Sequence, residues 1–80
     1  MSNRTAIDVQ DRPMAGDVID VTDAEGHEEM LRVVAVHEDR VWFKQYGAGH
    51  ALVSLAAWKK RLSESPCIKI IRGADHDNPF

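Results

Sequence analysis

Apolar and polar residues alternate with a period of two along most of the chain, which is the pattern of strands that bury one face. The alternation predicts five strands, over residues 16–22, 30–37, 40–46, 50–53 and 67–72. The second of these has apolar side chains on both faces, which favours a central or strongly curved strand. Residues 23–26 and 47–49 are typical of turns, and the pair Glu38 and Asp39 fits a tight hairpin.

The period changes after Ser54, where Leu55, Trp58 and Leu62 recur at spacings of three and four. Residues at these spacings share one face of a helix. Ser54 is a good N-cap residue, and Pro66 prevents a longer helix. The pattern therefore predicts a short helix of about two turns before the last strand. We expect Trp58 to pack in the core with the two leucines.

Together these elements predict a mainly β domain with one short α-helix, in the order β-β-β-β-α-β. An open sheet of five short strands with one bare face would bury little apolar surface. We therefore expect a small, five-stranded antiparallel barrel of SH3-like form. Residues 13–72 are expected to form this single domain, with a flexible N-terminal arm over residues 1–12 and a flexible C-terminal tail over residues 73–80.

Much of this patterning lies in three segments, GDVIDVTDAEG, RVWFKQYGAG and VSLAAWKKRL. These segments resemble the small single-domain proteins of phages and prophages, many of which are SH3-like. The resemblance covers residues 16–62 and rests on β-barrel patterning. It implies a protein that works by binding a macromolecule, and it carries over no catalytic residue.

Length and composition limit the classes of protein that the chain can represent. Its 80 residues make one compact unit and exclude a two-domain enzyme with an interdomain cleft. Apolar residues at 44% and charged residues at 29% are typical of a soluble globular domain. No apolar run approaches the roughly 20 residues that span a bilayer, and the N-terminal segment lacks a secretory signal. We therefore expect a cytoplasmic protein without membrane contact.

Charge is distributed unevenly around a net value of −3. Residues 1–39 contain three basic and ten acidic residues, whereas residues 40–80 contain seven basic and three acidic ones. This asymmetry can steer a charged partner, or it can be neutralised by pairing between neighbouring strands. The acidic set of the first half includes Asp17, Asp20, Asp23 and Glu25, which form either the solvated face of a strand or an imitation of a phosphate backbone.

The outward side of the third predicted strand is the best candidate for a binding face. Four side chains alternate to that side: Arg40, Trp42, Lys44 and Tyr46. Trp, Tyr and Arg dominate interface hot spots, and rings with cations can also stack unpaired bases and neutralise phosphates. We expect this stripe, together with His50, to bind a partner. The alternative is that Trp42 and Tyr46 pack beneath the helix as a second small core.

A second group of cations, Lys59, Lys60 and Arg61, falls in the last turn of the predicted helix. Cations there complement the negative end of the helix dipole, and they usually form a solvated face. The alternative is that they add electrostatic contacts to a partner.

Residues for catalysis or metal binding are not found in a recognisable arrangement. The four histidines, at positions 27, 37, 50 and 76, show no paired ligand spacing, so we expect no metal and no cofactor. The single cysteine, Cys67, cannot form an internal disulfide and is expected to pack as a small apolar residue. As a nucleophile it would need His37 or His50 nearby. We therefore expect no catalytic residues and no enzymatic activity.

These observations lead to two hypotheses about function. The first is a non-enzymatic phage-type or mobile-element-type protein that binds a host protein or nucleoprotein stoichiometrically. One form of this is inhibition of a bacterial defence or regulatory complex, as in anti-CRISPR-like proteins. The second is a small β-barrel that binds nucleic acid directly through the basic and aromatic face of residues 40–72. Neither hypothesis specifies an oligomeric state.

Overall fold

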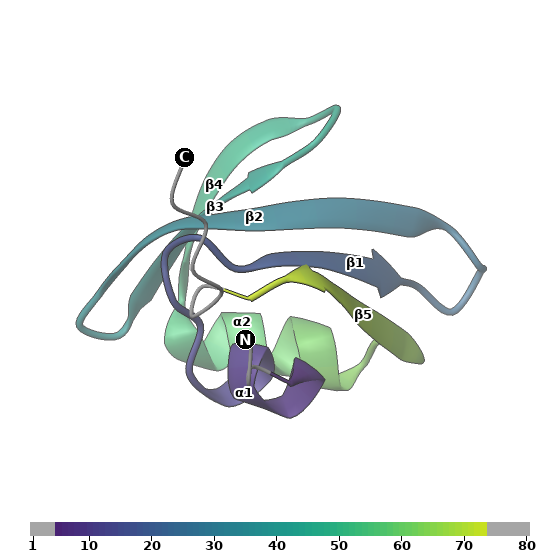
Figure 1. Ribbon diagram of the computed structural model, residues 1–80, viewed down its shortest axis with the longest axis horizontal. Helices are drawn as coiled ribbons and strands as arrows, with labels where there is room; N and C mark the ends of the chain where they lie inside the picture. Colours follow the sequence, from purple (N-terminus) through teal and green to yellow (C-terminus); the bar gives the residue numbers. More distant parts are fainter. Residues whose placement is uncertain (1–4, 74–80) are drawn as a thin grey trace.

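The five predicted strands form a single antiparallel sheet in the order β4-β3-β2-β1-β5 (Figure 1). The computed structural model describes residues 5–73. Its elements are α1 (Ala6–Asp11), β1 (Val18–Thr22), β2 (Glu28–His37), β3 (Arg40–Gln45), β4 (Gly49–Ser54), α2 (Leu55–Ser63) and β5 (Cys67–Arg72). The prediction of a mainly β domain with a helix before the last strand is confirmed. None of these helices has the length and hydropathy needed to cross a membrane.

The sheet is open, so the predicted closed SH3-like barrel is not confirmed. Strands β4 and β5 are its two edges and do not pair with each other. Both helices lie on the same side of the sheet, below it in Figure 1, where α2 contacts β3 and β4 and α1 contacts β5 and α2. Because the helices cover one face, the strands bury their apolar side chains without closing. The other face, which we call the outer face, carries no helix of the described residues 5–73.

The core lies between the sheet and the two helices. Every strand except β4 and β5 supplies fully buried side chains to it, and those two edge strands add partly buried ones. The fully buried members are Val9, Ile19, Val21, Leu31, Val33, Val41, Phe43, Trp58 and Leu62. The rings of Phe43 and Trp58 meet at its centre, with centroids 5.3 Å apart. Trp58 and Leu62 therefore pack in the core as expected, whereas Leu55, the third residue of that helical face, is only partly buried.

Helix α1 falls within residues 1–12, the segment expected to be a flexible arm. Thr5 and Asp8 form a reciprocal capping box, in which the Thr5 hydroxyl accepts from the Asp8 N–H at 3.1 Å and the Asp8 carboxylate accepts from the Thr5 N–H at 2.9 Å. Val9 is fully buried, and its carbonyl accepts a 2.9 Å hydrogen bond from Trp58 Nε1. The folded domain thus includes α1. Of the predicted tail, only Gly73 lies within the described residues, and it is buried.

Strand β2 is the central strand, as its two apolar faces predicted. Its pairing with β3 shifts register between Val33 and Ala35, because Val33 is opposite Phe43 while Ala35 is opposite Trp42. The extra residue at this bulge is Val34, which is exposed. The strict alternation expected along β2 therefore ends at Val33, and Ala35 comes to lie beside Trp42.

Candidate binding face on the outer side of the sheet

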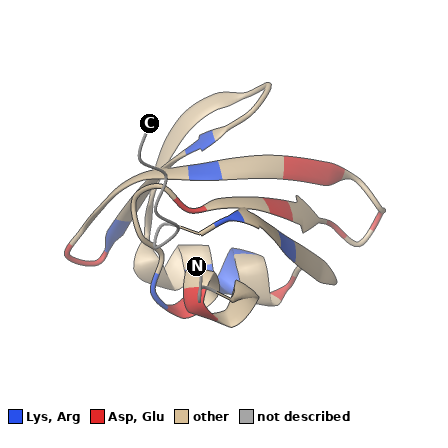
Figure 2. Ribbon diagram, viewed as in Figure 1, with Lys and Arg blue, Asp and Glu red and all other residues tan. Residues whose placement is uncertain are grey.

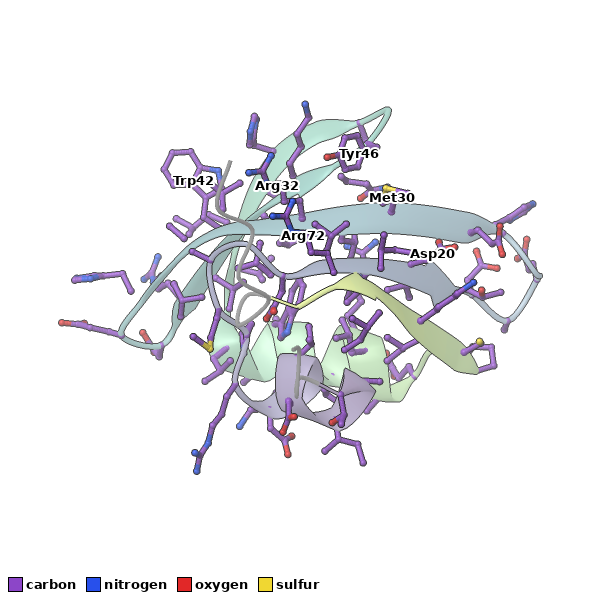
Figure 3. The ribbon with its side chains drawn as sticks, viewed as in Figure 1. Asp20, Met30, Arg32, Trp42, Tyr46 and Arg72 are labelled. Atoms are coloured by element: carbon purple, nitrogen blue, oxygen red, sulfur yellow. The ribbon has the colours of Figure 1, made fainter. Side chains whose placement is uncertain are left out.

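The outer face gathers side chains from several strands on the side away from the helices. Figure 3 shows Met30, Arg32, Trp42, Tyr46 and Arg72 projecting to this side. They come from β2, from β3 and the turn after it, and from β5. Because alternate residues of a strand point to opposite faces, the same strands that supply the core supply this surface.

Basic side chains from four strands lie in one line across the outer face. In the strand register Lys44 is directly opposite His50 on one side and Arg32 on the other, while Val18 is opposite both Arg32 and Arg72. The order across the sheet is thus His50, Lys44, Arg32, Val18 and Arg72. We call the four basic members of this line the cationic row.

The stability of the sheet does not explain why two basic residues of the row, Arg32 and Lys44, lie opposite each other. Arg32 and Lys44 are like charges in directly opposite positions, which destabilises a sheet. The Arg32 side chain forms no ion pair or hydrogen bond with another residue in the described range 5–73. Lys44 contacts the Tyr46 ring, with Nζ 5.2 Å from the ring centroid. Arg32 and Lys44 therefore present positive charge to solvent without an ion pair among residues 5–73.

One large aromatic ring lies on each side of the row, because Trp42 and Tyr46 are two residues before and after Lys44. Trp42 is 48% exposed and Tyr46 is 46% exposed. Trp42 is opposite Leu52, which is 57% exposed, and its ring meets the His50 ring edge-on at a centroid distance of 6.2 Å. The backbone N–H of Tyr46 donates to the Met30 carbonyl at 3.0 Å.

These exposures decide between the two interpretations of the aromatic residues. The rings of Trp42 and Tyr46 lie on the face opposite the helices and are half open to solvent. The alternative that they form a second small core beneath the helix is therefore wrong. Their role in binding a partner stays a prediction.

The structure brings all five predicted partner-binding residues to the outer face. Arg40 is exposed at the end of β3, opposite Ser54, and forms no ion pair with the described residues. His50 lies in the cationic row beside Lys44. Three further members were missed because they come from other strands: Arg32, Leu52 and Arg72. Only the strand register, which a single sequence does not specify, places them next to the predicted ones.

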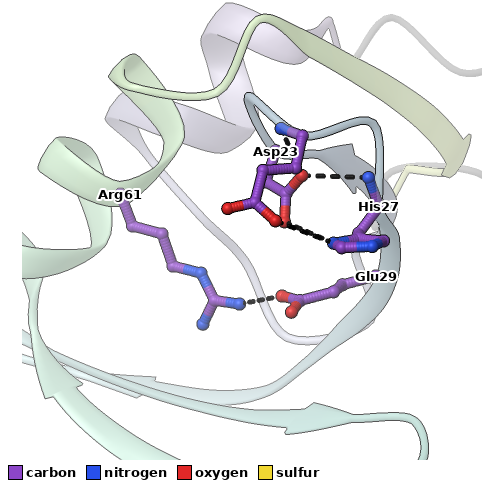
Figure 4. A network of polar contacts seen from close by, with 5 residues as sticks. Asp23, His27, Glu29 and Arg61 are labelled. Carbon is purple, nitrogen blue, oxygen red and sulfur yellow. Dashed lines mark hydrogen bonds and ion pairs between the residues drawn. The ribbon is translucent and has the colours of Figure 1, made fainter.

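The second predicted group of cations lies elsewhere. Lys59, Lys60 and Arg61 belong to α2, on the helix-covered side of the sheet (Figure 2). Arg61 forms an ion pair with Glu29, drawn in Figure 4, and its guanidinium lies 5.5 Å from the centroid of the Phe43 ring. A nucleic-acid face built from all the cations of residues 40–72 is therefore not present, since these three are separated from the rest.

The acidic residues of the first half do not form one surface either. Figure 2 shows acidic segments in α1, on β1 and in the turn between β1 and β2. Asp17 is fully buried and accepts a hydrogen bond from the Met14 N–H at 2.9 Å. Asp20 belongs to β1 instead, opposite Met30. A continuous imitation of a phosphate backbone cannot include a buried carboxylate, so that alternative is wrong for Asp17.

Asp23 organises the turn between β1 and β2. Its carboxylate accepts from the backbone N–H groups of Glu25 and His27, both at 2.9 Å, and lies 3.4 Å from His27 Nδ1 (Figure 4). The N–H of His27 is the main cause that lowers the pKa of Asp23, and it outweighs the opposing effect of desolvation. This carboxylate therefore stabilises the turn.

Among the described residues, no arrangement for nucleophilic catalysis forms around Cys67. The thiol is free and exposed on β5, at one edge of the sheet, whereas His50 is on β4 at the other edge. Cys67 aligns through Thr22 with Glu28, the first residue of β2, whereas His37 is the last residue of that strand. Within residues 5–73 no group of three or more His, Cys, Asp or Glu side chains could hold a metal ion. His76 lies outside the described residues.

Comparison with known proteins identifies no relative of this chain. No protein-family model, curated protein or solved structure matches this chain. The resemblance to small phage and prophage proteins stays a prediction that rests on the three segments quoted above.

Proposed function

We propose that the protein is a non-enzymatic binding protein that engages a host protein or nucleoprotein stoichiometrically through its outer face. The observation that carries this proposal is the pair of half-exposed rings, Trp42 and Tyr46, on a sheet face that no helix covers. In the phage-type or mobile-element-type form of the proposal, this binding inhibits a bacterial defence or regulatory complex.

The composition of the outer face supports recognition of a partner. Trp, Tyr, Met and Arg are the residues enriched at interfaces, and each is present here with its side chain exposed or half exposed. Leu52 and Val34 extend the apolar area around Trp42. Monomeric proteins rarely expose a contiguous apolar patch without using it. A partner that covers these side chains gains the hydrophobic free energy that the fold itself leaves unused.

The charges around the rings indicate the character of the partner. Arg32, Arg40 and Lys44 lie among the exposed apolar groups of this face, while the surplus acidic residues lie mainly in turns and on α1. Complementary potentials steer association and suppress wrong partners. The partner surface is therefore expected to be acidic or to carry phosphates.

The experiment compares two double variants in affinity capture from bacterial lysate. Trp42→Ala with Tyr46→Ala removes both rings, and Lys59→Ala with Lys60→Ala removes two side chains from the helix-covered side. Circular dichroism checks that both variants fold. Partners that bind the wild type and the helix-side variant but not the ring variant support the proposal. They are then purified and titrated to measure stoichiometry.

An identical set of captured partners from all three proteins would overturn the assignment of this face. A ring variant that fails to fold would be replaced by Trp42→Ser alone. Trp42 is half exposed, and its ring meets the ring of His50, which does not belong to the buried core. This single change is therefore expected to leave the fold intact.

A further inference from the structure

The cationic row runs across the strands as a line. Neighbouring strands lie about 4.8 Å apart, so about 10 Å separates His50 on β4 from Arg32 on β2, and about 19 Å separates His50 from Arg72 on β5. A compact cluster of cations would suit a single anion. Basic side chains in a line instead suit a chain that carries one negative charge per unit.

A hollow in the outer face adjoins the row. It is lined by Arg32, Lys44 and His50, by Val34, and by the turn at Ala15 and Gly16 that leads into β1. Three potential hydrogen-bond donors thus line one depression. A phosphate group placed there would meet basic side chains from three adjacent strands, which is the kind of contact that fixes a nucleic-acid backbone on a protein.

The rings stand where bases would lie on either side of such a backbone. Trp42, with His50 and Leu52, lines a second hollow whose walls are mainly apolar. Tyr46 lies on the other side of the row, next to Met30 and under the amino group of Lys44. Aromatic faces beside a positive track are the arrangement by which proteins hold single strands, because every base can stack on a ring.

We propose that the outer face binds single-stranded nucleic acid, with the backbone along the cationic row and bases stacked on Trp42 and Tyr46. The inference rests on the proposed function, since it names the chemistry of the partner at the same face. Rings that stack bases require those bases to be unpaired, which favours a single strand over a duplex. Within residues 5–73 the outer face presents strands and no helix that could enter a major groove. The net charge of −3 does not oppose this, because the row is local.

The test is fluorescence anisotropy with labelled oligonucleotides of about 16 nucleotides, the upper size of a single-domain site. The probes are oligo-dT, oligo-U, a DNA duplex and a poly-glutamate peptide, and each is measured at about 50 mM and about 200 mM salt. With two phosphates neutralised by Lys44 and Arg32, affinity for a single strand is expected to fall about 7-fold between these salt concentrations. Comparing oligo-dT with oligo-U shows whether the outer face prefers single-stranded DNA or single-stranded RNA.

Two variants separate the roles of the row and the rings. Arg32→Ala with Lys44→Ala is expected to remove most of the salt effect, because both phosphate contacts are lost. Trp42→Ala is expected to weaken binding by about 5- to 150-fold with an unchanged salt effect, because stacking carries no charge. Lys59→Ala with Lys60→Ala, on the helix-covered side, is the matched control and should bind as the wild type does.

The outcomes separate failure of the single-strand inference from failure of the proposed function. If the wild type binds no single strand at about 50 mM salt, or binds poly-glutamate or the duplex as tightly, the inference is overturned. Should lysate capture still depend on Trp42 and Tyr46 in that case, the partner is a protein and the proposed function stands. If oligonucleotides bind but capture ignores the rings, the inference stands and the proposed function fails.

Discussion

Replacing Trp58 with phenylalanine tests the contact that joins α1 to the rest of the fold. The Val9 carbonyl lies near the end of α1, where its regular helical donor would be the backbone N of residue 13. Residue 13 is proline and has no N–H. The carbonyl instead accepts from Trp58 Nε1 at 2.9 Å, in a buried position. The substitution removes this donor and keeps an aromatic ring against Phe43.

The expected loss follows from two contributions. A buried carbonyl left without a donor costs about 1–3 kcal/mol. The smaller ring also leaves part of the indole volume empty, which adds about 1 kcal/mol where the surroundings cannot collapse. The free energy of unfolding should therefore fall by about 2–4 kcal/mol. For a domain of this size each 1 kcal/mol lowers Tm by about 4–8 °C, so a decrease of at least about 8 °C is expected.

Urea unfolding followed by far-UV circular dichroism measures this difference. Trp42→Phe is the matched control, because it makes the same chemical change on the outer face, where the ring is 48% exposed. Its effect should stay within about 0.5 kcal/mol. Equal free energies of unfolding for the two variants would refute the argument that Trp58 satisfies the Val9 carbonyl and holds α1 on the core.

Three further substitutions test single features of the fold by urea unfolding. Ser54→Ala removes the hydroxyl that caps α2 by accepting from the backbone N–H of residue 57, and should cost about 1 kcal/mol; no loss would contradict the cap. Glu38→Gly should stabilise the hairpin by about 0.5–1 kcal/mol, because Glu38 has φ 55° at the first turn position, and destabilisation would contradict strain there. Because its pKa is lowered in the folded state, Asp23 contributes stability above its ordinary pKa and loses it as pH falls through the folded value. Asp23→Asn should therefore differ from the wild type at neutral pH and converge with it in acid, whereas a pH-independent difference would contradict this linkage.

Local patterns predict the strands, their inward faces and helix α2, because each depends on the spacing of apolar residues a few positions apart. Val41 and Phe43 are separated by one polar position, and Trp58 and Leu62 by one helical turn, so their faces follow from spacing alone. The tight hairpin at Glu38 was also predictable, although no glycine marks it. In each case the signal lies within a few residues.

Helix α1 and the open sheet were not predictable in the same way. Within α1 only Val9 is buried, so the six-residue helix shows no apolar period. The sequence did contain one signal, the spacing of Thr5 and Asp8 in the capping box. Because α1 was missed, the sheet seemed to need closure to bury its apolar face. In the structure that helix helps α2 to cover the face instead.

The candidate site was predictable only along one strand. Trp42 and Lys44 share a side of β3 because of the period of two, but Arg32 lies 12 positions before Lys44 in the sequence. Their adjacency depends on the pairing of β2 with β3, including the shift in register near Val34. Such long-range register depends on the packing of the whole domain, so the row became visible only in three dimensions.

Because both helices lie on one side of the sheet, alternate residues of a single strand are under different constraints. In β3, Val41 and Phe43 are constrained by folding, while the intervening Trp42 is not. Under the proposed function, substitution at Trp42 would change which partner binds, with little effect on folding yield. The outer face could then diversify one codon at a time while the scaffold stays the same.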